Sequence, residues 1–242
     1  VVECMVGCVM KMSDTLFRPL LLQFIDWSTQ ATAGHGRLVP LFRFAAATTE
    51  RIRHFFVPYF AHLLKYAADV LGEDEETTEL YGSEAQVLVS VILKALQRCF
   101  KYDDGEFLTG ERFKVLAPLL AAQLDLQDGE GTASYQERMG ADVIPVLVEF
   151  VSDTRDEKLW KLMNDVVLQK TRAGEPVVRE HALMVIEGIY DRVGEEFLSL
   201  LPETILYLSE LLEDDDLNVE RQNKKLIAKI ESFLGEPLSN YF

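Results

Sequence analysis

The histidines are the first side chains to consider, because paired imidazoles at suitable spacing can bind a metal ion. His54 and His62 are eight residues apart and could share a helical face, but Pro58 lies between them and no carboxylate completes a ligand set. His35 is expected in a loop, and His181 is expected inside an amphipathic helix. We therefore predict no metal ligand among the histidines.

Two acidic segments contain an Asp-Gly pair and could bind calcium, at residues 103–106 and 125–130. An EF-hand loop needs oxygen donors at alternating positions before its glycine. Here those positions hold aromatic or apolar residues, namely Tyr102 and Phe100 in the first segment and Leu126 and Leu124 in the second. Both segments are therefore interpreted as solvated loops.

Motifs for nucleophilic or phosphate chemistry are absent from the sequence. No Gly-Lys pair exists to form a phosphate-binding loop, and neither a Gly-x-Ser-x-Gly nor a His-Glu-x-x-His pattern occurs. Cys4 and Cys8 lack a Cys-x-x-Cys spacing and are interpreted, like Cys99, as small buried hydrophobic residues. We predict no catalytic, cofactor-binding or metal-binding residue, and assign no partner-binding residue. An enzyme would need a constellation that one sequence does not reveal.

The composition indicates a folded, strongly acidic chain. It has 242 residues, is 48% hydrophobic and carries a formal charge of −16. The apolar content excludes a disordered acidic tail, and the charge argues against a broad basic face for nucleic acid. The longest apolar stretches, such as residues 115–122, fall far short of the ~20 residues of a membrane helix. The acidic balance favours basic protein partners.

Apolar residues recur with helical periodicity along the whole chain, with almost no strand-like alternation. An apolar helix is expected at the N-terminus, where the sequence is interpreted as starting within a longer parent chain. Further helices are predicted at residues 14–30, 37–55, 57–71, 83–100, 109–124, 134–151, 156–171, 176–193, 195–212 and 217–234. The prediction is an all-α fold of about ten antiparallel helices.

Acidic and glycine-rich stretches divide this series. Residues 73–79 are predicted to form an acidic loop, and residues 125–133 a flexible acidic loop between two halves. The predicted organisation is an N-terminal helical half over residues 1–124 and C-terminal repeats over residues 134–242, ending at the native C-terminus.

Prolines and an internal repeat make this series resemble a HEAT-type α-solenoid. Five prolines lie within apolar helical patterns, at positions 19, 58, 118, 145 and 202, where each would bend or begin a helix. A shift of 41 residues aligns Val178 with Val219 and Gly194 with Gly235, within the ~40–47-residue period of HEAT repeats. The segment from Pro176 looks like the opening of a second HEAT helix, with Val178 facing the core and Arg179 near the inter-repeat ladder.

Two helices carry basic stripes that could contact RNA: Arg221, Lys224, Lys225 and Lys229 on one, and Lys94, Arg98 and Lys101 on the other. Acidic residues interleave with the first stripe, and no aromatic stacking platform is evident. A solvated helical face is the favoured interpretation, and direct RNA binding through the first stripe stays open as an alternative.

Several motifs resemble the C-terminal region of the HEAT repeat-containing protein 1 family. They are Leu16-Phe17-Arg18-Pro19-Leu20 with Phe24-x-Asp26-Trp27, Leu159-Trp160-Lys161-x-x-Asn164, Leu168-x-Lys170-Thr171-Arg172, Val178-Arg179, Leu200-Leu201-Pro202-Glu203-x-Ile205, Glu210-Leu211-x-Glu213-Asp214 and Leu234-Gly235-Glu236-Pro237-Leu238-x-x-Tyr241-Phe242. The likeness spans nearly the whole chain and is weakest in the two predicted acidic loops. These residues are interpreted mainly as packing positions, although Arg18 and Trp27 could anchor an interface.

The resemblance implies a non-catalytic scaffold in the nucleus and nucleolus. Members of this family act in pre-rRNA transcription and processing within the small-subunit processome, in the early-binding subcomplex on the 5′ external transcribed spacer. It implies processome proteins as partners, pre-rRNA or snoRNA contacted weakly or indirectly, and neither a membrane nor a small-molecule substrate. The alternative is another HEAT-repeat adaptor, such as a nuclear-transport receptor or a phosphatase scaffold.

Overall fold

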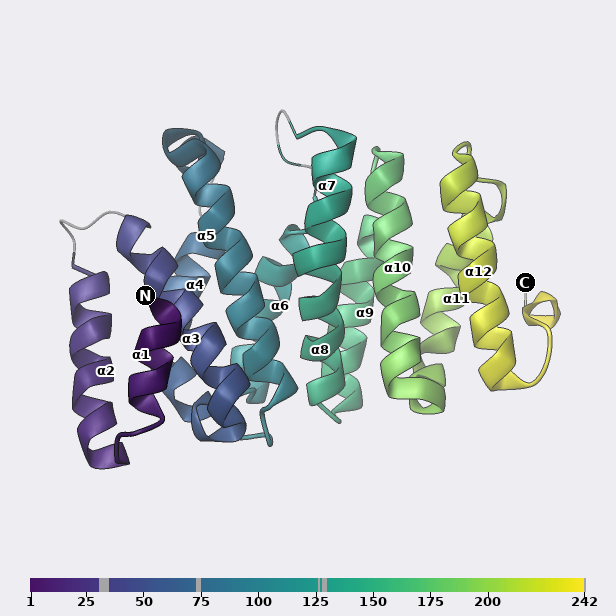
Figure 1. Ribbon diagram of the computed structural model, residues 1–242. Helices are drawn as coiled ribbons and strands as arrows, with labels where there is room; N and C mark the ends of the chain where they lie inside the picture. The colour runs from purple at the N-terminus through teal and green to yellow at the C-terminus, as the bar shows by residue number, and fades with distance from the viewer. Residues whose placement is uncertain (31–34, 73–74, 126, 128–129, 242) are drawn as a thin grey trace. The chain divides into compact units, whose positions relative to one another are not determined.

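The computed structural model describes residues 1–30, 35–72, 75–125, 127 and 130–241 (Figure 1). These residues form α-helices joined by short 3-10 helices and turns, and no strand occurs among them, which confirms the all-α prediction. The chain divides into two compact units, Val1–Arg112 and Phe113–Phe242. A division at residues 125–133 stays a prediction, and residues 126, 128 and 129 lie outside the described part.

The first unit contains α1 (Val2–Val9), α2 (Asp14–Ser28), α3 (Leu38–Ile52), α4 (Leu64–Leu71) and α5 (Glu75–Lys101). Helix α3 packs against α1 on one side and α5 on the other, while α2 and the 3-10 helix Val57–His62 contribute to a second layer (Figure 1). Aromatic rings join these elements. Phe17 of α2 packs edge-on against Tyr59 at 5.4 Å, and Phe44 of α3 packs edge-on against Phe24 of α2 at 5.6 Å.

The second unit begins within the first turn of α6 (Gly110–Ala122) and continues through a series of hairpins. Its other helices are α7 (Thr132–Arg138), α8 (Ile144–Asp153), α9 (Glu157–Lys170), α10 (Pro176–Val193), α11 (Leu201–Glu210) and α12 (Leu217–Leu234). Helices α8, α10 and α12 lie side by side with α10 in the middle, and α9 and α11 form the layer behind them (Figure 1). Two layers of antiparallel helices are the expected HEAT-like arrangement.

The predicted 41-residue repeat matches helices α10 and α12, whose bounds are offset by that number at both ends. Val178 and Val219 are both buried near the start of their helices. Gly194 and Gly235 follow the two helices with positive φ values of 75° and 80°, a conformation that glycine adopts without a Cβ penalty. The repeat therefore reproduces the end of the helix as well as its buried face.

Several element boundaries differ from the predictions, three of them by a change in the kind of structure. Helix α5 begins at Glu75, so the predicted acidic loop at residues 73–79 is helical from Glu75 onward, while residues 73 and 74 lie outside the described part. Residues 57–71 form a 3-10 helix followed by α4, and residues 195–212 begin in a 3-10 helix before α11. In both, a proline occupies the first positions of a helical segment, where its missing N–H costs no hydrogen bond.

The predicted helix at residues 134–151 is interrupted by a π turn over Met139–Val143, directly before Pro145 in α8. A proline removes one helical hydrogen bond and clashes with the carbonyl four residues earlier. A π turn widens the backbone at that position, so α7 and α8 continue as one helical path. Pro19 and Pro118 lie inside α2 and α6.

The interpretation of Cys4 and Cys8 as buried residues is wrong, because both are exposed on α1, whereas Cys99 is buried as predicted. Val6 is the buried residue of this short helix. Since α1 covers α3 with only one face, the remaining faces stay open to solvent.

No helix in the described residues combines the length and apolar character that crossing a membrane requires.

Gly188 of α10 lies close to α8, because a Cβ added there would lie 2.7 Å from Cγ2 of Val148. We expect Gly188→Ala to lower the free energy of unfolding by about 1–3 kcal/mol, the usual cost of overpacking. Urea unfolding followed by circular dichroism measures the change.

Gly140→Ala is the matched control, because an added Cβ meets nothing within 4 Å and the residue is exposed. It should leave stability unchanged or raise it by about 0.5–1 kcal/mol. Equal effects of the two substitutions would contradict close packing at Gly188.

Candidate interaction surfaces

His54, His62 and His181 are placed as ordinary structural residues. His181 is buried, where its Nδ1 lies 2.7 Å from the carbonyl oxygen of Val177 and its ring packs edge-on against Tyr135. His54 is exposed with its ring tilted against that of Phe55, and His62 is exposed at the end of a 3-10 helix. Among the described residues, no group of three His, Cys, Asp or Glu side chains is arranged to hold a metal ion.

The acidic segment at residues 103–106 is an organised turn. The carboxylate of Asp103 accepts hydrogen bonds from the backbone N–H groups of Glu106, Phe107 and Leu108 at 2.7–3.2 Å. Arg112 donates to the carbonyl oxygen of Phe107 at 2.7 Å. These bonds use the Asp103 oxygens to shape the chain between α5 and α6.

The acidic residues near position 125 bind basic side chains of the same unit. Lys170 lies 2.5 Å from an oxygen of Asp125, and Arg138 makes a two-point contact with Glu130 at 2.8 and 2.9 Å. Arg138 also donates to the carbonyl oxygens of Gln123 and Asp125. Residues 126, 128 and 129, which belong to the candidate calcium segment, lie outside the described residues.

Polar side chains link α9 to α11 along their length. Asn164 donates to the hydroxyl of Thr204 at 3.1 Å in the buried interior, and Gln169 donates to the hydroxyl of Tyr207 at 2.7 Å. Two ion pairs flank these bonds: Lys161 with Glu203, and Arg172 with Glu210. Arg172 also lies over the Tyr207 ring at 4.1 Å. Each hairpin is therefore tied to the next by side chains as well as by packing.

Arg179 makes the most buried of the ion pairs that link α10 to the next hairpin. Its guanidinium contacts both carboxylate oxygens of Asp214 at 2.7 and 2.9 Å, with 14% and 8% of the two side chains exposed. Arg179 also donates to the carbonyl oxygens of Ala173 and Gly174. The predicted position of Arg179 at the inter-repeat ladder is confirmed.

The acidic turn before α12 supplies the carboxylate that Arg179 contacts. Although burial favours the neutral acid, hydrogen bonds from Arg179 and from the backbone N–H of Asp216 hold the pKa of Asp214 below its ordinary value. Asp216 in turn caps α12, accepting from the N–H groups of Asn218 and Val219. The acidic residues of this turn therefore act in folding.

Three of the four cations in the stripe on α12 contact carboxylates. Glu187 of α10 lies 2.8 Å from Lys229 and 3.1 Å from Lys225, and it accepts a 2.7 Å hydrogen bond from Gln222. Burial raises the pKa of Glu187, but these hydrogen bonds outweigh it and hold the pKa below its ordinary value. Lys224 pairs with Glu220. The stripe is thus largely neutralised, which weakens its support for an RNA contact.

The residues of the last motif fold back onto α12. Beyond Gly235, the side chain of Leu238 is fully buried, and its backbone N–H donates to Glu231 at 2.8 Å. Trp160, from another motif, donates its indole N–H to the carbonyl oxygens of Val151 and Thr154, which end α8. Both placements support the interpretation of these motifs as packing positions.

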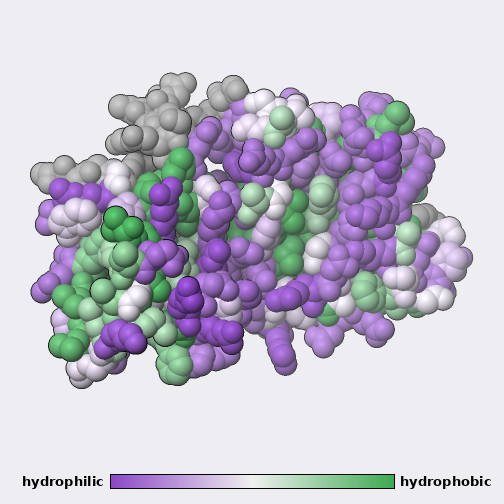
Figure 2. All heavy atoms as spheres, viewed as in Figure 1, coloured by the Kyte–Doolittle hydropathy of each residue, from purple (hydrophilic) through white to green (hydrophobic). Residues whose placement is uncertain are grey.

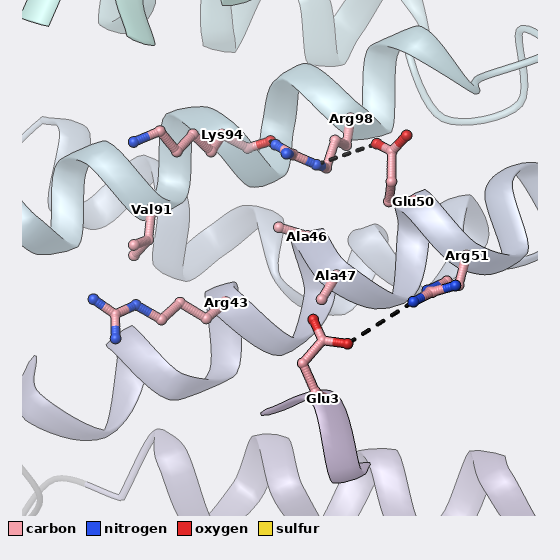
Figure 3. Close-up of a pocket in the computed structure, with 9 residues that line it drawn as sticks. All are labelled: Glu3, Arg43, Ala46, Ala47, Glu50, Arg51, Val91, Lys94 and Arg98. Carbon is pink, nitrogen blue, oxygen red and sulfur yellow. Dashed lines mark hydrogen bonds and ion pairs between the residues drawn. The ribbon is translucent and has the colours of Figure 1, made fainter. Parts of the chain in front are cut away.

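The second predicted basic stripe borders a groove between α3 and α5 with a volume of about 450 Å³ (Figure 3). Its lining residues are Glu3, Arg43, Ala46, Ala47, Glu50, Arg51, Val91, Lys94 and Arg98. The alanines and Val91 form an apolar strip, while four cations and two carboxylates border it. We call this feature the α3–α5 groove.

One end of the α3–α5 groove is fixed by Glu50. This carboxylate lies 3.3 Å from Arg98 and 3.8 Å from Lys101, and it accepts a 2.9 Å hydrogen bond from the hydroxyl of Tyr102. Arg53 lies over the Tyr102 ring at 5.8 Å. Glu50 therefore joins the C-terminal ends of α3 and α5.

A smaller apolar groove of about 190 Å³ lies between α1, α2 and α3. It is lined by Met5, Cys8, Val9, Met12, Phe17, Leu20, Leu21, Phe24 and Phe44. Figure 2 shows apolar residues gathered over α1 and α2 on the face in view, whereas the face of α10 and α12 is mostly hydrophilic. Trp27 is half exposed, with Arg37 over its ring at 4.5 Å.

Three α3 residues of the α3–α5 groove were not predicted from the sequence: Arg43, Glu50 and Arg51. Periodicity places these residues on one helix but does not pair that helix with α5. The basic stripe on α5 was the only feature of the sequence that pointed to the groove, and it accounts for the α5 side alone.

Comparison with known proteins gives a consistent result. The BP28CT (NUC211) domain matches residues 1–108. HEAT repeat-containing protein 1 of Homo sapiens is 34% identical over 250 residues, covering 100% of this chain and 12% of that protein. The Danio rerio protein of the same name is 33% identical over 262 residues, which cover 100% of this chain and 12% of that protein. U3 small nucleolar RNA-associated protein 10 of Chaetomium globosum is 29% identical over 239 residues, 96% and 13%. The chain thus spans about an eighth of the length of these relatives.

The pair Arg179–Asp214 should give a pH-dependent contribution to stability. We expect Asp214→Asn to lower the free energy of unfolding by about 2 kcal/mol at neutral pH, because a partly buried guanidinium loses its anion. Because the folded pKa of Asp214 is depressed, this contribution is present above the unfolded pKa of about 4 and is lost as pH falls through the folded pKa. Urea titrations of both proteins at several pH values measure the difference.

Asp215→Asn removes a neighbouring, exposed acid from the same turn and serves as the control. It should change stability by less than about 0.5 kcal/mol at every pH. A difference between Asp214→Asn and the parent chain that persists unchanged into acid would contradict the ion-pair argument.

Arg53 has a φ of 54° and ψ of −129°, a strained conformation for any residue but glycine. We expect Arg53→Gly to raise the free energy of unfolding by about 1 kcal/mol and Arg53→Ala to give no gain, because only glycine relieves the strain. Thermal and urea unfolding of the two variants compare them with the parent. An alanine variant as stable as the glycine variant would show that the backbone is not strained there.

Proposed function

The chain belongs to the HEAT repeat-containing protein 1 family, and on that premise we propose that it is a non-catalytic scaffold segment of a ribosome-biogenesis protein. The match over the whole chain, 34% identical to the human relative, is the observation that carries the proposal. The proposed role is in pre-rRNA transcription and processing, toward 18S rRNA maturation, within the small-subunit processome. Relatives named U3 small nucleolar RNA-associated protein 10 support this role and a nucleolar location.

The arrangement of polar side chains supports a scaffold. In the second unit, four ion pairs join successive hairpins: Lys161 with Glu203, Arg172 with Glu210, Arg179 with Asp214, and Glu187 with Lys229. Such links stabilise a stack of hairpins and leave its outer faces for contact with other macromolecules. Within the part of the chain that the structure describes, His181 bonds to the backbone of its own helix, Asp103 shapes a turn, and no group of three His, Cys, Asp or Glu side chains could hold a metal ion.

The proposed partners are other processome proteins, including those of the early-binding subcomplex on the 5′ external transcribed spacer. RNA is proposed to be contacted weakly or indirectly, because phosphate neutralisation supplies most nucleic-acid affinity and three of the four cations in the α12 stripe already contact acids. The proposal therefore rests on protein–protein contacts.

Deleting this segment from the full-length protein in cells tests the proposal. We expect 18S precursors to accumulate and mature 18S rRNA to fall, while large-subunit rRNA is less affected, because a scaffold is needed to assemble the machinery that releases the small-subunit RNA. Northern blots measure the precursors, and immunoblots check that the shortened protein is present at normal abundance.

Affinity purification of the intact and shortened proteins from nucleolar extract provides the second readout. Processome proteins should be recovered with the intact protein and depleted with the shortened one. Unchanged precursors and unchanged recovery in cells with normal levels of shortened protein would overturn the proposal. Recovery of a transport GTPase or phosphatase subunits instead would identify another kind of HEAT adaptor.

A further inference from the structure

The α3–α5 groove carries a local charge opposite to that of the chain. The whole chain has a formal charge of −16, yet this groove is bordered by Arg43, Arg51, Lys94 and Arg98 against two carboxylates. Arg43 is exposed and makes no ion pair or hydrogen bond with any described residue. The groove is therefore a place where an anionic group would be attracted at short range.

The charges are distributed unevenly along the groove. Figure 3 shows Arg43 and Lys94 extending toward the same end, with Val91 between them, and the ion pairs Glu3–Arg51 and Glu50–Arg98 toward the other end. The ammonium of Lys94 is steadied by a 3.0 Å hydrogen bond to the hydroxyl of Ser90. The end that holds Arg43 and Lys94 thus presents two cations from two different helices.

The surface between these cations is apolar. Ala46 and Ala47 are half-buried on α3, and Val91 faces them from α5 with 9% of its surface exposed. Alanine side chains leave room for a ligand to approach the helix closely, and aliphatic carbons favour an apolar group there. A matching ligand combines a carboxylate with a small apolar side chain.

We propose that the α3–α5 groove binds a short acidic segment of a protein partner. One or two carboxylates of this segment contact Arg43 and Lys94, and a neighbouring apolar side chain lies on Ala46, Ala47 and Val91. This inference names the chemistry of a partner for the proposed scaffold and rests on that function for its biological role.

An acidic peptide fits this groove better than RNA does. A nucleic-acid strand carries a charge on every phosphate, so phosphates beyond the cationic end would be repelled by Glu3 and Glu50 farther along the groove. A peptide with two or three carboxylates places charge only at the cationic end. It also uses the apolar strip, which offers phosphates nothing.

Fluorescence anisotropy with the whole 242-residue chain tests the proposal. The probe is a labelled peptide of alternating Asp and Leu, compared with the same peptide carrying Asn for Asp and with labelled oligouridine. We expect the parent chain to bind the acidic peptide, and the Asn peptide and oligouridine to bind at least about tenfold more weakly. The Arg43→Gln/Lys94→Gln double variant should weaken acidic-peptide binding about tenfold, as expected for the loss of charge-assisted hydrogen bonds.

The matched control is Lys11→Gln/Lys65→Gln, which removes the same charge from exposed positions of the same unit. It should bind the acidic peptide within about twofold of the parent. Ala47→Leu adds a test without any charge change. The larger side chain fills the apolar strip, so this variant should also bind the acidic peptide more weakly. Circular dichroism and thermal unfolding confirm that each variant is folded before its affinity is compared.

The results separate the groove from the proposed function. No binding of the acidic peptide, or equal losses in the groove and control variants, would overturn the groove assignment even if deletion of the segment still impairs 18S maturation. Tighter binding of oligouridine that depends on Arg43 and Lys94 would overturn it in favour of RNA. Conversely, groove-dependent peptide binding together with normal 18S maturation after deletion would retain the groove and reject the processome role.

Discussion

A single helical hairpin cannot bury its own apolar faces, and the second unit depends on how its hairpins solve that problem together. Helix α10 contacts α8, α9 and α12, so most of its apolar side chains are enclosed by neighbours on three sides. Polar residues are placed where the hairpins meet: Asn164 and Thr204 in one layer, and Arg179 and Asp214 in the other. Burial supplies most of the stability, while these directional contacts specify the register of one hairpin on the next.

Helices with strong end signals were predicted best. The bounds of α10 and α12 are the predicted ones, because proline or Asp216 begins them and a glycine with positive φ ends them. Prediction was poorest where tertiary packing decides. The exposure of Cys4 and Cys8 depends on how much of α1 is covered, and the π turn before Pro145 depends on a continuous path from α7 to α8. Apolar periodicity alone contains neither fact.

The interaction surfaces were only partly accessible from the sequence for a similar reason. Two basic stripes were predicted, and they have different surroundings. Glu187 lies opposite Lys225 and Lys229 of α12 and offsets part of their charge, whereas α3 places Arg43 opposite Lys94 and adds to the positive charge. The net charge of the chain favours basic partners over long distances, but a groove of this size is governed by the few charges that border it. Whether a basic stripe is neutralised or reinforced therefore depends on which helix packs against it, and local sequence does not encode that pairing.

The links between the hairpins of the second unit also have a mechanical consequence. Contacts from α9 to α11 lie in one layer of the stack, and contacts from α10 to α12 lie in the other. Bending this joint toward either layer would stretch the bonds of the opposite layer, as in a beam reinforced on both surfaces. The joint should therefore resist flexing in both directions. Joined in this way, the hairpins should move together as one stiff body, and a displacement of one hairpin should be passed on to the next.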